Sequence, residues 1–355
     1  MSRRFLCKDC WLAHDVTTLL ARCKRCEANT QIERLDPLPG KMSGGAAAAR
    51  GGPAVCRIHP GEPLDVFCGS CRREVPPRTL VEDGSVVAIL GDTEAGKTSL
   101  LWTVSERLRQ PNGGVMIRSA FGDSDEQMLR AMREISERGR FSATAATDAD
   151  VRNYAWEVAN DAGVTTVLAF HDAAGEIWNE LARLPASTYD RFYRYLDLVG
   201  SVVFAIDGAR VAEALETLSR RGIASPQSRA AQTHEISIVD AVSRRFRARR
   251  QRLPAAAVIT KADMLWSRDD CSAFHPDSGA DADAIHAAAR EVLLQAGRQQ
   301  LLQTLSDTFD PLRFFAVSAF GRTPPQPLRI EDLAPSRVEE PFLALLRSVV
   351  VEVRG

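Results

Sequence analysis

The sequence lacks several features that would assign it to a specialised class of protein. No apolar run approaches the roughly 18 residues that a membrane-spanning helix requires. The 45 basic and 46 acidic residues nearly cancel, so the net charge of −1 gives no overall field that would attract nucleic acid or an anionic membrane. We therefore expect a protein without a transmembrane segment and without a nucleic-acid partner.

Lysine is scarce, and cysteine is nearly absent beyond residue 71. Most of the 45 basic residues are arginine, a bias that is typical of a GC-rich bacterial genome. Cys7 follows the chain start closely, without the apolar stretch of a signal peptide, so we expect a cytoplasmic protein. In that reducing setting the clustered cysteines indicate metal binding rather than disulfides. The isolated Cys271 is interpreted as a lone thiol in a loop.

The composition divides the chain into two cysteine-rich modules, a linker and one large domain. Residues 1–36 and 55–75 hold the modules, and residues 37–54 form a glycine- and alanine-rich linker without core-forming content. From 84 to 354, apolar segments alternate with helical patterns, which predicts an α/β domain with a mostly parallel, six-stranded sheet. The expected strands are residues 85–90, 152–158, 164–170, 201–206, 255–260 and 312–318. The expected helices are residues 97–109, 124–138, 176–198, 210–221, 226–250, 283–305 and 337–352.

The first cysteine-rich module has the spacing of a zinc ribbon. Cys7, Cys10, Cys23 and Cys26 form two C-x-x-C pairs, and each pair can present two sulfurs to one tetrahedral ion. So short a segment cannot build a hydrophobic core, so zinc binding would supply the free energy of folding. His14 is an alternative ligand, although an ordinary surface histidine is the simpler interpretation. A redox-active pair would need a thioredoxin-like context, which this segment does not have.

The second module offers three sulfurs and one imidazole, from Cys56, His59, Cys68 and Cys71. The stretch that contains them resembles part of a B-box zinc finger. Four protein ligands leave no open position on a metal ion, so we expect a structural rather than a catalytic zinc. The sequence thus predicts two Zn²⁺ ions, one in each module.

The most informative segment of the chain follows the apolar run at 85–90. Residues 91–98 read G-x-x-x-x-G-K-T and lead into the helical pattern at 97–109, which is the context that a phosphate-binding loop requires. Backbone N–H groups of such a loop surround the phosphates, and the start of the helix adds positive potential. We expect Lys97 to reach the β- and γ-phosphates and the Thr98 hydroxyl to coordinate Mg²⁺. The expected phosphate-binding residues are Gly91, Asp92, Thr93, Glu94, Ala95, Gly96, Lys97, Thr98 and Ser99.

A D-x-x-G motif follows the predicted strand at 164–170. In this motif Asp172 is placed to hold Mg²⁺ through water. The backbone N–H of Gly175 is placed to sense a γ-phosphate.

Two further motifs at predicted strand ends suit a guanine base. Thr260, Lys261 and Asp263 form T-K-x-D, in which the carboxylate can accept hydrogen bonds from N1–H and N2–H₂ of guanine. The stem of Lys261 would lie along the base. Ser318 and Ala319 follow the last predicted strand, where a backbone N–H could meet guanine O6.

With these motifs in this order, the region 84–354 resembles a Ras-like P-loop GTPase of the TRAFAC class. The long gaps between motifs and the N-terminal zinc modules are similar to those of bacterial double-GTPase proteins of conflict-type gene clusters. The resemblance implies that GTP or GDP binds with Mg²⁺ and that water attacks the γ-phosphate in line. It also implies a switch I threonine that completes the Mg²⁺ shell, for which Thr144 and Thr147 are both candidates.

Departures from the family pattern predict slow hydrolysis. Glu176 stands where the family often has the glutamine that orients the attacking water. Thr93 and Glu94 occupy loop positions that are small in Ras proteins, and an added segment lies at about 110–141. Arg140 precedes the switch threonines, where an arginine supplied in cis could neutralise transition-state charge. The alternative for Arg140 is a basic helix end favoured by the helix dipole.

The arginine-rich run at 244–252 is interpreted as a solvated surface, with a docking face for an acidic partner or anionic lipid as the alternative. The function predicted from the sequence is a GTP-binding molecular switch with slow, Mg²⁺-dependent hydrolysis, whose zinc modules contact a protein effector or regulator. The alternative is a GTP-bound scaffold with negligible turnover, which Glu176 favours. A nucleic-acid binder with an ATPase motor is disfavoured by T-K-x-D and by the near-neutral charge.

Overall fold

The structure of the protein is a computed structural model. It describes, in the α/β region, residues 85–109, 115–120, 152–160, 165–172, 199–221, 226–247, 252–321 and 333–352, with positions 126 and 196. Of the first 75 residues it describes short segments that include all the cysteines. In these parts of the chain, every helix is too short or too polar to cross a membrane.

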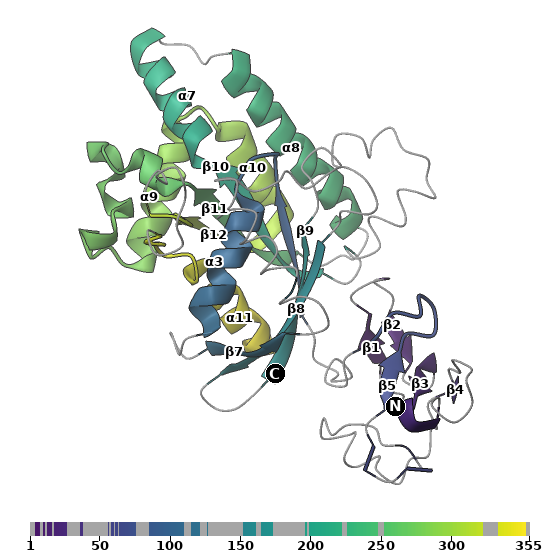
Figure 1. The fold of residues 1–355 in the computed structure, drawn as a ribbon. Coiled ribbons are helices and arrows are strands. Elements are labelled where there is room, and N and C mark those ends of the chain that lie inside the picture. Colours follow the sequence, from purple (N-terminus) through teal and green to yellow (C-terminus); the bar gives the residue numbers. More distant parts are fainter. Residues whose placement is uncertain are drawn as a thin grey trace.

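A seven-stranded sheet forms the centre of the described α/β region, in the order β12-β11-β10-β6-β9-β8-β7 (Figure 1). The strands from β12 to β9 in this order are parallel, and β8 and β7 are antiparallel to their neighbours. Their bounds are β6 (Ser85–Gly91), β7 (Val115–Ala120), β8 (Arg152–Asn160), β9 (Thr165–Asp172), β10 (Val199–Asp207), β11 (Leu253–Thr260) and β12 (Phe309–Ala316). The predicted α/β class and mostly parallel sheet are therefore confirmed, with β7 as a strand that the sequence analysis missed.

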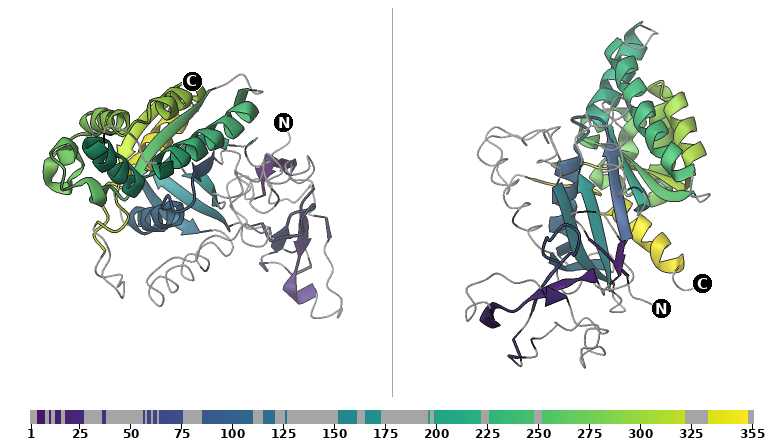
Figure 2. Two further views of the ribbon diagram at one scale, coloured as in Figure 1. Left: turned by 90° about the horizontal axis from the view of Figure 1, so that it is seen from above. Right: turned by 90° about the vertical axis from the view of Figure 1, so that its right-hand side faces the viewer.

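Helices cover both faces of the sheet because the central strands are apolar on both sides. Along β6, Val86, Ala88 and Leu90 join one buried cluster, while Val87 and Ile89 join the other. The first cluster packs against α7 (Gly208–Arg221), α8 (Pro226–Arg247), α9 (Ala282–Gln295) and α10 (Gln299–Thr308). The second packs against α3 (Lys97–Arg109) and α11 (Glu340–Glu352), and Figure 2 shows α3 and α8 on opposite sides of the sheet.

Two expected features of the second half of the domain differ in detail. The expected helix 283–305 is two helices, α9 and α10, which separate at Gly297, where the backbone adopts a left-handed φ of 75°. Cys271 lies in a short 3-10 helix (Asp269–Phe274) and is fully buried, where burial raises the pKa of its thiol to about 12. The expected helices 124–138 and 176–198 fall almost entirely outside the described residues.

The cysteine-rich segments form their own small sheets. Strands β1 (Arg4–Leu6) and β2 (Ala13–Asp15) are antiparallel, and β3 (Leu20–Arg22) lies between β4 (Asp36–Pro37) and β5 (Asp65–Phe67). The pairing of β3 with β5 joins residues from the two segments that were expected to be separate modules. Figure 1 shows these strands grouped together, apart from the seven-stranded sheet.

Candidate nucleotide site and zinc centres

The candidate site lies where the parallel strands end. The loop at 91–96 follows β6, the T-K-x-D segment follows β11, and Ser318 follows β12 by two residues. Ligands of parallel α/β sheets bind at this carboxyl edge, because the strand ends and helix starts meet there.

The loop after β6 wraps around the ammonium group of Lys97. The Lys97 Nζ donates hydrogen bonds to the carbonyl oxygens of Gly91, at 3.0 Å, and Asp92, at 2.8 Å. The loop closes with a bond from Ala95 N to the Asp92 carbonyl, and α3 begins with a bond from Leu100 N to the Gly96 carbonyl. A buried ammonium held by loop carbonyls, next to the start of a helix, is the arrangement that suits a bound phosphate chain.

One loop residue that the sequence analysis singled out adopts an unusual backbone. Glu94 has a left-handed φ of 65°, which is uncommon for a residue with a Cβ, and its side chain is exposed. Backbone conformations of this kind cluster at ligand-binding sites. The side chain of Asp92 is instead buried and forms ion pairs with the helices behind the loop.

The hydroxyl of Thr260 supports the phosphate-binding loop. This hydroxyl lies 2.8 Å from the carbonyl oxygen of Ala95 and 3.1 Å from that of Ile206, so one proton is shared between β10 and the phosphate-binding loop. The next residue, Lys261, has a left-handed φ of 49° and places its Nζ 3.1 Å from the Asp207 carboxylate. Gly208 permits this close packing, since a Cβ there would lie 2.1 Å from the Thr260 carbonyl oxygen.

A cavity of about 240 Å³ opens between the loop and the ends of β11 and β12. Its polar end contains Asp263 and Ser318; the Ser318 hydroxyl donates to Asp263 Oδ1 and accepts a hydrogen bond from Gly321 N. Its remaining walls are mainly apolar, a common design for sites that bind a planar ring and orient it with a few polar groups. The lining residues are Gly96, Ser99, Leu100, Ala209, Thr260, Lys261, Asp263, Met264, Val317, Ser318, Ala319 and Phe320.

The cysteines form two groups of four ligands, but not the groups that the sequence suggested. Cys7 and Cys10 lie with Cys68 and Cys71, whereas Cys23 and Cys26 lie with Cys56 and His59. The expected grouping within each segment is therefore wrong: each group takes two ligands from residues 1–36 and two from residues 55–75. The β3–β5 pairing explains this exchange, because it places Cys23, just after β3, beside the second segment.

Both groups have the dimensions of a tetrahedral zinc site. A Zn–S bond of about 2.3 Å places neighbouring sulfurs about 3.8 Å apart. The sulfurs of Cys7 and Cys71 lie 3.6 Å apart, and those of Cys10 and Cys68 lie 3.8 Å apart.

The second group fits the same geometry with one nitrogen ligand. The sulfurs of Cys26 and Cys56 lie 3.8 Å apart, and His59 Nδ1 lies 3.4 Å from the Cys26 sulfur. The distance from His59 Nδ1 to the Cys23 sulfur is 3.6 Å. Donors at these separations surround a volume of the size of one Zn²⁺ ion, so these residues could hold zinc.

Residues 85–314 match the family described as Double-GTPase 2. The chain belongs to the Double-GTPase 2 family. The predicted resemblance to GTPases is thereby confirmed, and guanine-nucleotide binding is expected for a member of a GTPase family. No curated protein matches the sequence.

Two solved structures illustrate what this double-GTPase is similar to in fold. One is nucleolar GTP-binding protein 1 of Plasmodium falciparum, with a TM-score of 0.37, 10% identity, and coverage of 77% of this chain and 89% of that chain. Another is the signal recognition particle receptor SRb-GTP/SRX complex of Chaetomium thermophilum, with a TM-score of 0.34, 13% identity, and coverage of 68% and 95%.

Several expected site residues of the double-GTPase fall outside the described residues: Arg140, Thr144, Thr147, Gly175 and Glu176. The backbone of Asp172 is described, and its register opposite Ile89 puts it beside the end of β6. The apolar cavity residues Met264 and Phe320 belong to none of the motifs recognised in the sequence. Each follows a polar motif residue closely in the sequence, and this adjacency was the available signal.

Proposed function

We propose that this double-GTPase is a molecular switch that binds GTP and GDP and hydrolyses GTP slowly. The observation that carries the proposal is that one cavity is lined both by a carboxylate suited to a guanine base and by the phosphate-binding loop. Asp263 and Gly96, which belongs to the phosphate-binding loop around Lys97, both line the cavity. A carboxylate in that position accepts from guanine N1–H and N2–H₂, and adenine has no matching pair of donors.

The chain supplies binding and electrostatics for the reaction. Lys97 would neutralise charge on the β- and γ-phosphates, and the backbone N–H groups of the loop would orient them. Thr98 and Asp172 would hold Mg²⁺, whose charge would stabilise the transferred phosphoryl group. The sequence motifs and the position of the Asp172 backbone support this assignment.

Slow turnover is proposed from Glu176, which follows the D-x-x-G motif. A carboxylate next to a γ-phosphate is repelled by it, and it cannot donate the hydrogen bond with which a glutamine amide engages the reacting groups. The same residue supports the second candidate function, a GTP-bound scaffold with negligible turnover. Single-turnover hydrolysis with purified protein separates the two, because a scaffold shows no release of phosphate above the rate in buffer.

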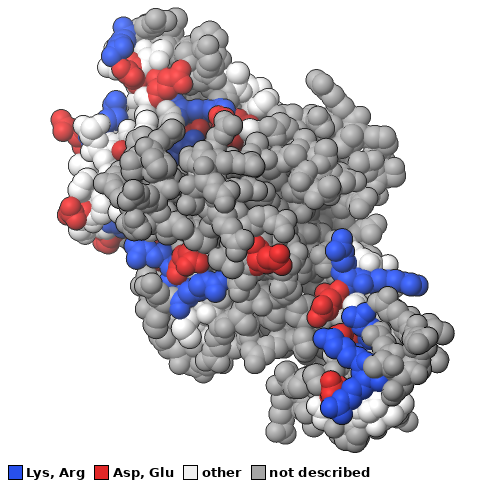
Figure 3. Space-filling view, in the orientation of Figure 1, with Lys and Arg blue, Asp and Glu red and all other residues white. Residues whose placement is uncertain are grey.

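The cysteine-rich region is proposed to contact a protein partner. On the face drawn in Figure 3, basic and acidic side chains lie close together on this region. Lys24 and Arg25 are exposed and pair with Asp65 and Glu62, respectively. Such a mixed surface favours a protein over a nucleic acid, whose recognition requires a predominantly basic face.

The test of the base assignment is Asp263→Asn. An asparagine amide would donate to the C2 carbonyl of xanthine, so nucleotide preference should move from guanine to xanthine nucleotides. Asp277→Asn, at a residue that is 90% exposed and outside the cavity, is the matched control and should keep the preference for guanine. Chromatography of the nucleotide released from denatured wild-type protein provides the first check; release of ATP would contradict the proposal.

A further inference from the structure

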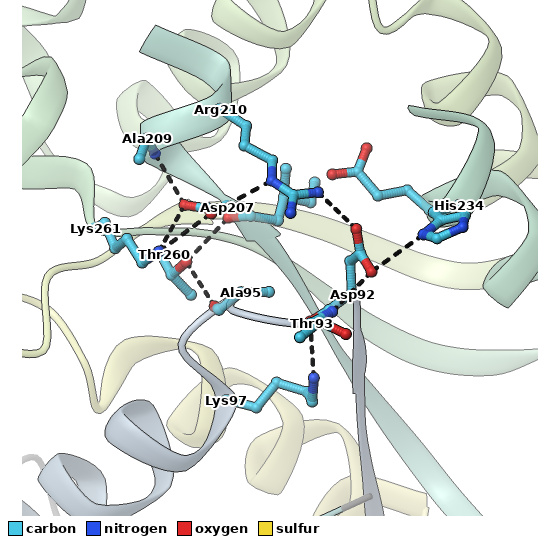
Figure 4. Close-up of polar contacts among 12 residues, drawn as sticks. Asp92, Thr93, Ala95, Lys97, Asp207, Ala209, Arg210, His234, Thr260 and Lys261 are labelled. Atoms are coloured by element: carbon cyan, nitrogen blue, oxygen red, sulfur yellow. Dashed lines mark hydrogen bonds and ion pairs between the residues drawn. The ribbon is translucent and has the colours of Figure 1, made fainter. Parts of the chain in front are cut away.

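The phosphate-binding loop is held from behind by two helices that carry charged side chains. Arg210 in the first turn of α7 donates from Nη1 to Asp92 Oδ2 at 2.7 Å. His234 on α8 places its Nδ1 3.4 Å from Asp92 Oδ1, the atom that also accepts from Thr93 N at 2.7 Å (Figure 4). The carboxylate of Asp92 thus ties the loop backbone to both helices.

Arg210 also connects this carboxylate to the base side of the site. Its Nε lies 3.8 Å from Asp207 Oδ2, and Lys261 Nζ lies 3.1 Å from the same carboxylate group. Both Asp92 and Asp207 have side chains that are only 6% exposed, while Arg210 is 31% exposed. Charges therefore alternate from the phosphate-binding loop to the T-K-x-D segment, in the order Asp92, Arg210, Asp207, Lys261.

This arrangement makes Arg210 the one group that contacts both buried carboxylates among the described contacts. Buried carboxylates are stable as anions only when a cation or hydrogen-bond donors offset their charge. Without the guanidinium, Asp92 and Asp207 would repel each other across the end of the sheet. The Asp92 side chain would then move away from its present position. The Asp92 carbonyl oxygen, which accepts a hydrogen bond from Lys97 Nζ, would move with it.

We propose that Arg210 is a positioning residue for the nucleotide: it fixes the phosphate-binding loop through Asp92 and couples it to the base-binding segment through Asp207. The inference rests on the proposed function, since it assigns a role in holding GDP and GTP. Arg210 acts through the two carboxylates, and no contact between Arg210 and the nucleotide is required. The network predicts that phosphate and base contacts loosen together when Arg210 is lost.

The test measures the dissociation rate of a fluorescent methylanthraniloyl-GDP from the full chain. Arg210→Gln should release the nucleotide about tenfold faster, the effect of losing one charge-assisted hydrogen bond. Arg220→Gln is the matched control: it removes an arginine from the same helix, 74% exposed and paired with Glu216, and should leave the rate unchanged. Arg210→Lys keeps the positive charge, but its single nitrogen cannot contact both carboxylates as the guanidinium does, so an intermediate dissociation rate is expected. This variant replaces Arg210→Gln in the test if the glutamine variant does not fold.

A double-mutant cycle distinguishes positioning from a general loss of stability. In the background of Asp92→Asn, the further change Arg210→Gln should accelerate release by less than about threefold, because the main partner has already lost its charge. Fully additive effects on the release rate would overturn the proposal, even if both variants are less stable in urea. A wild-type rate in Arg210→Gln would overturn it as well.

Failure of the proposed function gives a different result. If wild-type protein binds no guanine nucleotide, the proposed function and this inference fall together. If wild-type protein binds and Arg210→Gln behaves as wild type, only the role of Arg210 is refuted.

Discussion

The exchanged grouping of the candidate zinc ligands makes a prediction that a pair of substitutions can test. In the structure, Cys68 and Cys71 share one group of four ligands with Cys7 and Cys10. The double substitution Cys68→Ser with Cys71→Ser therefore removes two of the four ligands of that group. Two remaining thiolates cannot complete a tetrahedral site, so one ion should be lost. Zinc content should fall from two ions per chain to about one, with the loss of the roughly 10–16 kcal/mol that structural zinc binding supplies at such a site.

The assay is alkylation of the free thiols in the folded full chain, followed by mass spectrometry of the digested protein. Metal-bound sulfurs are protected, because bound Zn²⁺ occupies the lone pair that would attack the reagent. We therefore expect Cys7 and Cys10 to become alkylated, while Cys23, Cys26 and Cys56 stay protected. Cys271 provides an internal check on unfolding, because it is fully buried in the α/β domain and reacts only if that domain opens.

The alternative grouping gives the opposite pattern. If each segment bound its own ion, the same substitutions would free Cys56 and leave Cys7 and Cys10 protected. That result would refute the arrangement seen in the structure. The reciprocal pair, Cys23→Ser with Cys26→Ser, should free Cys56 and leave Cys68 protected.

Two further predictions concern catalysis and stability. Arg140→Ala should slow single-turnover GTP hydrolysis without weakening GTP binding, because a cis arginine acts on transition-state charge, and an unchanged rate would contradict this role. Burial raises the pKa of Glu235 from 4.5 to about 7 despite its ion pair with Arg298, so the folded state retains a proton that the unfolded state loses in this range. The free energy of unfolding should therefore fall by up to about 3 kcal/mol as the pH rises from about 4.5 to about 7. Urea titrations at several pH values measure this free energy. Glu235→Gln should reduce its dependence on pH, and an unchanged pH dependence would contradict the role of Glu235.

The sequence predicted the α/β class and the elements around the nucleotide site because their signals are local. A glycine-rich loop between an apolar run and an amphipathic segment is readable within 25 residues, and β6 and α3 begin and end close to the predicted positions. The division between α9 and α10 was missed because one glycine interrupts a continuous helical pattern. β7 was missed because it lies at the edge of the sheet, where no clear apolar alternation is required.

The zinc grouping could not be predicted from spacing, because spacing reports which residues are ligands and not which ligands share an ion. C-x-x-C pairs identify two sulfurs that meet, and each of the three pairs does stay together in the structure. The combination of pairs depends on whether β3 pairs with β5, a contact between residues about 45 positions apart. The long intervening segment adds little to the entropy cost of that contact, since the cost of closing a loop rises only with the logarithm of its length.

The contact between Asp92 and Arg210 spans 118 positions in sequence, yet it follows from the strand order. In the register of the sheet, Gly91 on β6 lies beside Ala205 on β10, and Asp207 lies beside Thr260 on β11. Asp92, one residue beyond Gly91, and Asp207, two residues beyond Ala205, therefore lie at the same edge of the sheet, where both carboxylates are buried. Arg210, at the start of α7, lies within ion-pair distance of both carboxylates. The strand order thus brings Arg210 next to both buried carboxylates. A substitution of either aspartate should therefore alter the positions of both the phosphate-binding loop and the base-binding segment.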